Sequence, residues 1–131
     1  MKKHQYAKHF TVEEARKELT MVHALASKMA ELKKILDSRG WDVRRHQYFG
    51  GMGPNGDGSF PAEMETLVEI LMQLESKGIV VKGMEDGLID FPHLRKGGEE
   101  VFLCWKVGEN DINFWHHLND GFAGRKKIEE L

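Results

Sequence analysis

The sequence predicts an α+β fold, in which a long antiparallel helical hairpin precedes a small antiparallel β-meander of three to four strands. Two patterns predict it. As far as residue 77, apolar residues recur at steps of three and four, which is the period of an α-helix. From residue 79 they recur at every second position, the period of a β-strand. At 131 residues the chain is close to the commonest domain size, and we expect a single domain.

The first helix is expected over residues 11–39. Thr11 and Glu14 have the spacing of a capping box, in which each side chain accepts a hydrogen bond from the other residue's backbone at a helix start. Gly40 marks the end. At 1.5 Å per residue this helix spans about 40 Å, longer than a small domain needs, so we expect part of it to contact another molecule. Its apolar stripe consists of Val12, Ala15, Leu19, Val22, Ala26, Met29, Leu32 and Leu36.

The second helix is expected over residues 61–77. It follows Pro61 and ends at Gly78, which is a typical stop. Segment 40–60 between the helices is interpreted as a loop, because its stretch Gly50–Ser59 reads GGMGPNGDGS and is rich in residues that end regular structure. The apolar stripe of the second helix consists of Met64, Leu67, Leu71 and Leu74.

Residues 79–117 are expected to form the β-meander, followed by a tail at 118–131. A β-branched run from Ile79 to Val81 faces residues 87–91 across a turn at 84–86, and strongly alternating strands follow at 100–107 and 112–117. The competing assignment for the last strand is a short helix over 111–118.

A tight turn at 108–111 would set the register of the last two strands. Leu103 then faces His116 on one side of the sheet. The full predicted pairing on that side is Val107 with Ile112, Trp105 with Phe114 and Leu103 with His116. On the other side it is Phe102 with His117, Cys104 with Trp115 and Lys106 with Asn113.

Composition and charge restrict the cellular location and the kinds of binding partner that we expect for this protein. The chain has 19 basic and 21 acidic residues and a formal net charge of −2, without the basic block that nucleic-acid binding requires, so a nucleic-acid partner is disfavoured. No apolar run of signal-peptide or membrane-span length is present, and we expect neither secretion nor membrane insertion. The single cysteine cannot form an intrachain disulfide, which fits a reducing cytoplasm.

Three phrases in the last third carry a resemblance. They are DFPxxR (Asp90, Phe91, Pro92 and Arg95), CWxxGE (Cys104, Trp105, Gly108 and Glu109) and WHxLxxGFAGR (Trp115, His116, Leu118, Gly121, Phe122, Ala123, Gly124 and Arg125). With FTVEEA near the start and GIVVKGMEDGLIDFP in the middle, the chain resembles the small bacterial and archaeal proteins grouped as domain of unknown function 2203. The resemblance runs from Phe10 to Arg125 and implies no particular activity, substrate or cofactor. The Gly50–Ser59 loop departs from the pattern.

The same third concentrates titratable and aromatic groups, from which a site could be built. Guanidinium groups bind carboxylate or phosphate bidentately, so both arginines are candidates for contact with an anionic ligand. The structural alternatives are an ion pair of Arg95 with Asp90, and an Arg125 that braces the tail. The candidate site consists of Asp90, Arg95, Trp115, His116 and Arg125.

His116 has two interpretations: a metal ligand or general base, or a core histidine bonded to a backbone carbonyl. Adjacent strand residues point apart, so His116 and His117 cannot bind one metal together, and partners such as Asp90, His93 or Glu109 would be needed. Because no compact ligand spacing is present, the sequence predicts no metal site and leaves His116 as the candidate ligand.

Cys104 is interpreted as a small buried hydrophobe. The alternative is a nucleophile whose pKa is lowered by His117 or His93. The sequence decides neither a catalytic residue nor a cofactor.

Two classes of function follow. The first is a small cytoplasmic binding or interaction protein that forms a homo-oligomer, most simply a homodimer, through its long helices. The second is a small enzyme or metal-binding protein with a pocket between the helical hairpin and the sheet. Trp115 and Phe122 would wall that pocket, and Asp90, Arg95, His116 and Arg125 would line it.

Overall fold

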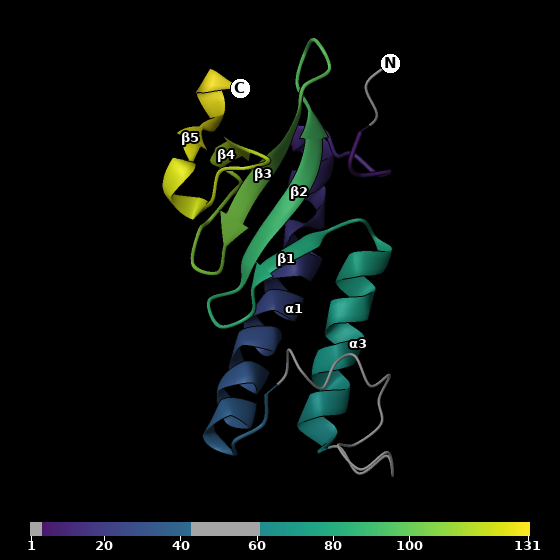
Figure 1. Ribbon diagram of the computed structural model, residues 1–131, viewed down its shortest axis with the longest axis vertical. Coiled ribbons are helices and arrows are strands. Elements are labelled where there is room, and N and C mark those ends of the chain that lie inside the picture. The colour runs from purple at the N-terminus through teal and green to yellow at the C-terminus, as the bar shows by residue number, and fades with distance from the viewer. Residues whose placement is uncertain (1–3, 43–60) are drawn as a thin grey trace.

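The computed structural model describes residues 4–42 and 61–131, so the predicted loop Gly50–Ser59 lies outside the described residues. Within these two ranges it contains two α-helices, α1 (Val12–Ser38) and α3 (Ala62–Ser76), and one antiparallel sheet. The strands, in their order across the sheet, are β1 (Val80–Gly83), β2 (Leu88–Leu94), β3 (Glu100–Lys106), β4 (Phe114–His117) and β5 (Lys126–Lys127). The architecture is α+β, and α1 passes behind the sheet and continues below it beside α3 (Figure 1).

Helix α1 begins where the capping box predicts. The backbone N–H of Glu14 donates to Oγ1 of Thr11 at 3.0 Å, and the backbone N–H of Thr11 donates to Oε1 of Glu14 at 2.9 Å. These two bonds satisfy donors that the first turn of a helix would otherwise leave free. Glu14 is therefore explained by the cap.

Helix α3 runs antiparallel to α1 and closes the helical part of the core. Its buried side chains are Met64, Leu67, Ile70, Leu71 and Leu74, which pack with the apolar stripe of α1. Gly78 follows with φ of 82°, a backbone conformation that a side chain disfavours, so the predicted stop is confirmed. No helix in the described ranges is both long and apolar enough to cross a membrane.

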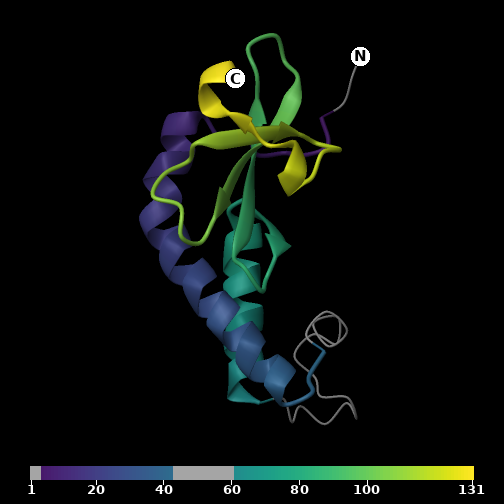
Figure 2. The ribbon, with the colours of Figure 1, turned by 90° about the vertical axis from the view of Figure 1, so that its left-hand side faces the viewer.

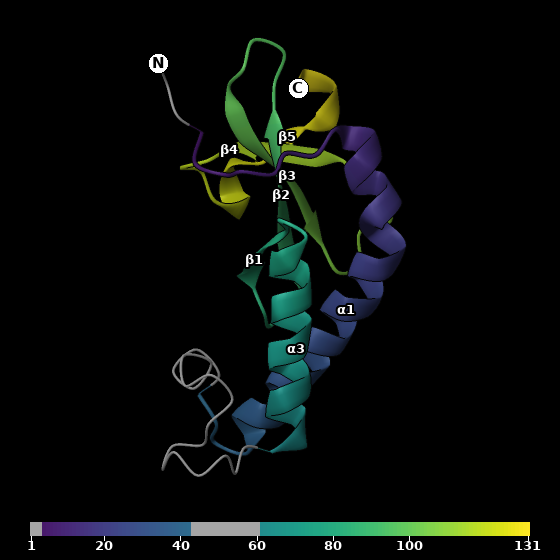
Figure 3. The ribbon, with the colours of Figure 1, turned by 90° about the vertical axis from the view of Figure 1, so that its right-hand side faces the viewer.

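The sheet has an inner face, packed against α1, and an outer face turned away from it. Figures 2 and 3 show α1 on one side of the sheet and the short 3₁₀ turn η2 (Phe122–Gly124) on the other. The inner face supplies the core residues Ile89, Phe91, Val101, Leu103, Trp105 and Trp115. The outer face carries Asp90, Phe102, Cys104 and His116, which are buried without joining that core.

The register of β3 and β4 differs from the predicted one by a single residue. Leu103 lies opposite Trp115, and Phe102 lies opposite His116. A shift of one residue moves every side chain of a strand to the other face, so Trp115 is in the core and His116 is on the outer face, the reverse of the prediction. The predicted tight turn is wrong as well. Fully buried Ile112 is outside β4, in the longer connection between β3 and β4.

The last strands differ from the prediction in number but not in type. β4 is a strand, so the alternative helix over 111–118 is wrong. The tail adds a fifth strand, β5, because Lys126 and Lys127 pair with Trp115 and Phe114. Trp115 also holds the tail against β4, because its Nε1–H donates to the carbonyl oxygen of Lys127 at 3.1 Å. Two residues are too few to display an alternation in sequence, so the strand could not be read there.

Candidate functional site

The five predicted site residues divide between the two faces of the sheet. Asp90, His116 and Arg125 belong to the outer face, whereas Trp115 belongs to the core. Arg95 lies with its Cζ atom 4.6 Å from the centre of the Trp115 ring and pairs with Glu99 at 2.9 Å. The predicted pairing of Arg95 with Asp90 is therefore wrong.

The predicted pocket between the hairpin and the sheet does not hold these residues. A hollow of about 470 Å³ does lie between α1 and the connection after β3, lined by Leu19, His23 and Trp105 among others. None of the five predicted residues lines it. The candidate site is instead on the opposite side of the sheet.

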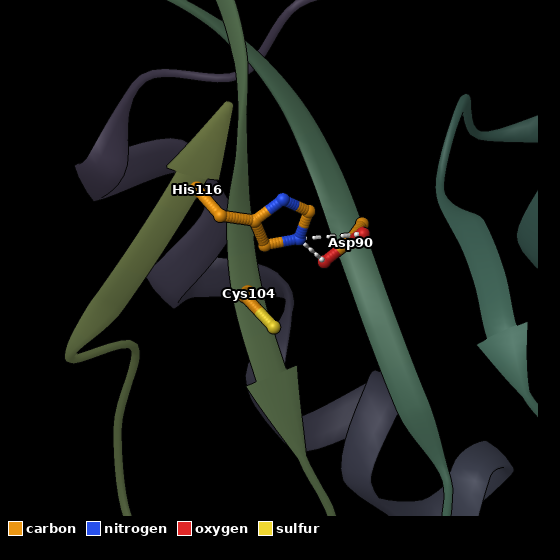
Figure 4. A group of neighbouring side chains, drawn as sticks. All are labelled: Asp90, Cys104 and His116. Carbon is orange, nitrogen blue, oxygen red and sulfur yellow. Dashed lines mark hydrogen bonds and ion pairs between the residues drawn. The ribbon is translucent and has the colours of Figure 1, made fainter. Parts of the chain in front are cut away.

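Three neighbouring strands build the site by alternation. In β2, Asp90 lies opposite Cys104 of β3, and both side chains point outward. In β4, His116 lies opposite Phe102, the outward residue two positions before Cys104. The imidazole reaches diagonally across β3 toward Asp90, with Cys104 beside it (Figure 4).

The three side chains form a compact polar cluster. Nε2 of His116 lies 3.1 Å from Oδ2 and 3.2 Å from Oδ1 of Asp90. One ligand atom of each of Asp90, Cys104 and His116 lies within 4.8 Å of the other two. The exposed fractions are 1% for Asp90, 1% for Cys104 and 3% for His116, so the cluster is almost completely buried.

The second imidazole nitrogen is also engaged. Nδ1 of His116 lies 2.8 Å from the carbonyl oxygen of His117, and a carbonyl can only accept, so Nδ1 carries a hydrogen and donates. Backbone and carboxylate together fix the ring orientation. His116 thus combines the predicted hydrogen bond to a backbone carbonyl with a side-chain contact to Asp90, so both ring nitrogens have a partner.

Burial and hydrogen bonding set the charges. Burial lowers the pKa of His116, but the hydrogen bonds to Asp90 and to the carbonyl of His117 raise it by more, so the pKa lies above its ordinary value. Burial, followed by the negative charge of Asp90, raises the pKa of the Cys104 thiol well above its usual range. The His116 imidazole and the Asp90 carboxylate therefore form a buried ion pair whenever the imidazole is protonated, beside a Cys104 thiol whose protonated form is favoured.

The two histidines that were proposed to activate Cys104, His93 and His117, are bonded to other groups. His93 Nδ1 contacts the carbonyl oxygen of Phe10 at 2.7 Å, and His117 Nδ1 contacts Glu99 at 2.7 Å. Both residues occupy inner-face positions of their strands, because they are one residue away from an outward neighbour.

The N-terminal segment borders one side of the cluster. The Tyr6 ring packs edge-on against Phe102, with centres 5.3 Å apart, and Lys82 Nζ lies 4.5 Å from the centre of the Phe102 ring. Glu100 holds this segment, accepting hydrogen bonds from the backbone N–H groups of Gln5 and Tyr6 at 2.7 and 2.9 Å. His9 contacts the same carboxylate at 2.7 Å.

Arg125 borders the other side. Its Cζ atom lies 3.8 Å from the centre of the Phe114 ring and 4.4 Å from that of Phe122, so the guanidinium is held between two aromatic rings. Nη2 donates to Oε2 of Glu109, whose other oxygen accepts from the backbone N–H of Lys106 at 2.8 Å. Arg125 therefore braces the tail, as one of its predicted roles requires.

A comparison with protein-family models matches residues 8–128 to a family described as an uncharacterized conserved protein, DUF2203. The chain belongs to the DUF2203 family. Comparisons with curated proteins and with solved structures give no match.

The phrases by which the chain resembled DUF2203 meet at the outer face. DFPxxR supplies Asp90, CWxxGE supplies Cys104 and Glu109, and WHxLxxGFAGR supplies His116 and Arg125. Far apart in sequence, these residues become neighbours because β2, β3 and β4 are adjacent strands.

Sequence reasoning missed the grouping of Cys104 with His116 in this DUF2203 chain. The predicted register placed them on opposite faces, while the observed register places them on the same one. The signal that favours the observed register is the size of Trp115, since a large apolar ring gains more from burial against α1 than an imidazole does. Tyr6 and Lys82 were not singled out in the sequence, and the fold brings both near the cluster.

Proposed function

We propose that this chain is a metal-binding protein in which Asp90, Cys104 and His116 hold a divalent transition metal, of which Zn²⁺ fits best. The observation that carries the proposal is the convergence of one oxygen, one sulfur and one nitrogen donor within 4.8 Å in a buried cluster. These are the three donor types that zinc accepts in proteins. The proposal develops the predicted role of His116 as a ligand and moves the site to the outer face.

The spacing of two of the donor atoms fits tetrahedral coordination. Two ligand atoms bound to one zinc at 2.0 Å are separated by roughly 3.3 Å in a tetrahedron. Nε2 of His116 and Oδ2 of Asp90 are 3.1 Å apart, which is close to that edge. Three protein ligands leave a fourth position for water or substrate, the arrangement of catalytic rather than structural zinc sites.

The backbone contact of His116 supports the same role. Metal-bound histidines usually donate their other ring N–H to a carboxylate or a backbone carbonyl, which fixes the tautomer and aims the free nitrogen. The Nδ1 contact with the carbonyl of His117 leaves Nε2 as the atom that faces Asp90 and Cys104. A bound cation would replace the protons of the imidazole and the thiol, since both groups bind metals in their deprotonated forms.

Cobalt titration tests the proposal. Co²⁺ substitutes for zinc, and its bond to a thiolate gives a charge-transfer absorption in the near ultraviolet. We expect chelator-treated protein to gain this absorption at one equivalent of Co²⁺, and zinc to remove it by competition. Cys104→Ser should abolish the band, because the sulfur is its source.

His117→Asn is the matched control for His116→Asn. The two histidines are adjacent, but His117 is 38% exposed and contacts Glu99 on the opposite face. His116→Asn should weaken Co²⁺ binding by 10-fold or more, on the order of the loss of one ligand or its support. His117→Asn should not change it. Absence of the absorption in folded wild-type protein, or equal binding by both variants, contradicts the proposal.

A homodimer through the helices is a second proposal, from a separate observation. The helices continue past the sheet (Figures 1 and 3), and Met72 on α3 is 63% exposed. Helices that project past the sheet offer a surface on which a second copy could pack, as in helical bundles, and Met72 would lie on it. Such a protein could act in the cytoplasm whether or not it binds a metal.

Light scattering tests the dimer. We expect twice the chain mass at micromolar concentration, and a shift toward the monomer in Met72→Glu, because a charge would be buried at the contact. Met72 lies away from the outer face, so Co²⁺ binding should not change. A monomer in the wild-type protein contradicts this second proposal.

A further inference from the structure

Arg125 carries an unsatisfied donor. Within the part of the chain that the structure describes, its Nε is the one buried side-chain nitrogen or oxygen that lacks a hydrogen-bond partner. The Arg125 side chain is 8% exposed, so bulk water does not compensate. A buried donor left unpaired is costly, and such an atom in a folded protein requires an explanation, of which an acceptor bound at this position is one.

This donor lies next to the proposed metal site. The Phe114 ring, on which Arg125 stacks, belongs to the residue directly opposite Cys104 in the β3–β4 ladder. Opposite residues in a ladder share a face and have neighbouring side chains. The positive charge of Arg125 is close enough to oppose the rise in the pKa of the Cys104 thiol.

The charges around the cluster favour an anion. With a divalent cation bound, the charges of Asp90 and of a Cys104 thiolate balance the metal, and Glu109 balances Arg125. On the same face, Lys82 above Phe102 and Lys106 above Phe122 outnumber Glu100, which leaves a net positive charge. Arginine has only donors, so the group that satisfies Nε must supply an acceptor, for which the oxygens of an anion are well suited.

We infer that the outer face binds a small oxyanion, a phosphate or carboxylate group, with Arg125 as its recognition residue. The inference rests on the proposed function in one respect, because the open position of the metal would bind one oxygen of the anion. A second oxygen accepts from the Nε–H of Arg125. Phe122, 45% exposed, covers the guanidinium at the solvent side and would border the path of entry.

Nuclear magnetic resonance of the arginine Nε–H groups tests this in the whole chain, with inorganic phosphate and acetate as probes. In the Zn²⁺-loaded protein, we expect phosphate to shift the Arg125 Nε–H resonance saturably. In the Co²⁺-loaded protein, we expect phosphate to change the cobalt absorption. At saturating Co²⁺, Arg125→Gln should weaken phosphate binding about 10-fold or more, the effect of losing a charged hydrogen bond. A stronger effect of phosphate than of acetate identifies the phosphate source, and the reverse identifies the carboxylate source.

Arg95→Gln is the matched control. Arg95 also stacks on an aromatic ring and pairs with a glutamate, but it does so at Trp115, on the inner side of the sheet. Its resonance should not respond, and its replacement should leave phosphate binding unchanged.

The outcomes separate the two proposals. Co²⁺ binding without any response of Arg125 to either anion overturns this inference and leaves the metal site standing. If Co²⁺ does not bind, the proposed function fails, and the same titration of the metal-free protein decides the inference. A saturable shift confined to Arg125 then supports an oxyanion site without metal, and its absence overturns one.

Discussion

Nε2 of His116 lies 3.1 Å from Oδ2 of Asp90, although the two residues occupy strands β4 and β2, which are not neighbours in the sheet. The contact bridges β3, and it is almost completely buried. Partners of a buried ion pair depend strongly on each other, because removing one leaves an uncompensated charge in a medium that solvates it poorly. The stability of the metal-free sheet should therefore depend on this pair.

Asp90→Asn tests that dependence. In the metal-free protein we expect the pKa of His116, followed by NMR, to fall from above its ordinary value to below it, because burial remains and the carboxylate is gone. The free energy of unfolding should fall by about 3 kcal/mol, measured by urea denaturation at a pH at which His116 is charged.

The sign of the pH dependence follows from the raised pKa. The contribution of the pair to stability is fully present below the ordinary histidine pKa and is lost as the pH rises through the folded value. The difference between wild type and Asp90→Asn should therefore shrink toward alkaline pH. Glu99→Gln is the control, because it removes the carboxylate of the exposed Glu99–His117 pair and should cost less than about 1 kcal/mol. Equal losses in the two variants contradict the prediction.

Glu100→Gln should loosen the N-terminal segment. Burial raises the pKa of Glu100, but hydrogen bonds from His9, Gln5 and Tyr6 lower it by more, so the pKa lies below its ordinary value. We expect the variant to lose about 1–3 kcal/mol of unfolding free energy at neutral pH, since charged acceptor bonds are weakened.

Acid should remove the same contribution from the wild type. Because the folded pKa of Glu100 is lowered, its contribution is present above the ordinary glutamate pKa and is lost as the pH falls through the folded value. The two proteins should then converge in stability. Hydrogen exchange at the amides of Gln5 and Tyr6 reports the segment directly, and unchanged protection in Glu100→Gln would contradict the prediction.

Trp115→Ala tests the register of β4. The side chain is buried against the helices, so its removal should cost about 3–5 kcal/mol in urea denaturation followed by circular dichroism. Phe122→Ala removes a ring on the outer face that is 45% exposed, and it should cost about 1 kcal/mol or less. A small loss for Trp115→Ala would favour the register in which that ring faces outward.

Cys104 should be unreactive toward a thiol reagent in the native metal-free protein. The thiolate is the reactive form, and burial and Asp90 both disfavour it. With Ellman's reagent at pH 8, we expect modification to follow the unfolded fraction as urea is added. Rapid modification without urea would show that the site is open and would support the nucleophile alternative.

The helices could be predicted because their signals are local. Thr11 and Glu14 are three residues apart, and each apolar stripe repeats within one segment, so neighbouring residues decide both the start and the buried side. The alternation of β3 could be predicted for the same reason.

The candidate site could be predicted only in part. Asp90, His116 and Arg125 were identified from their chemistry, but Arg95 and Trp115 belong to the other side of the sheet. Cys104 was separated from His116 by a one-residue error in register. Strand register depends on how side chains pack against residues far away in the sequence, and the sequence of a four-residue strand does not decide it.

The sequence by itself determined the two helices, the order of the first four strands and the residue types available for chemistry, because these depend on periodicity and capping within short segments. The tertiary structure decided which face each strand turns outward, and so which residues meet. Trp115 occupies the core because burial of its ring against α1 is favourable, and His116, as its neighbour on a strand, must then point to the outer face beside Asp90 and Cys104. The burial of Trp115 thus brings together the residues of the candidate site.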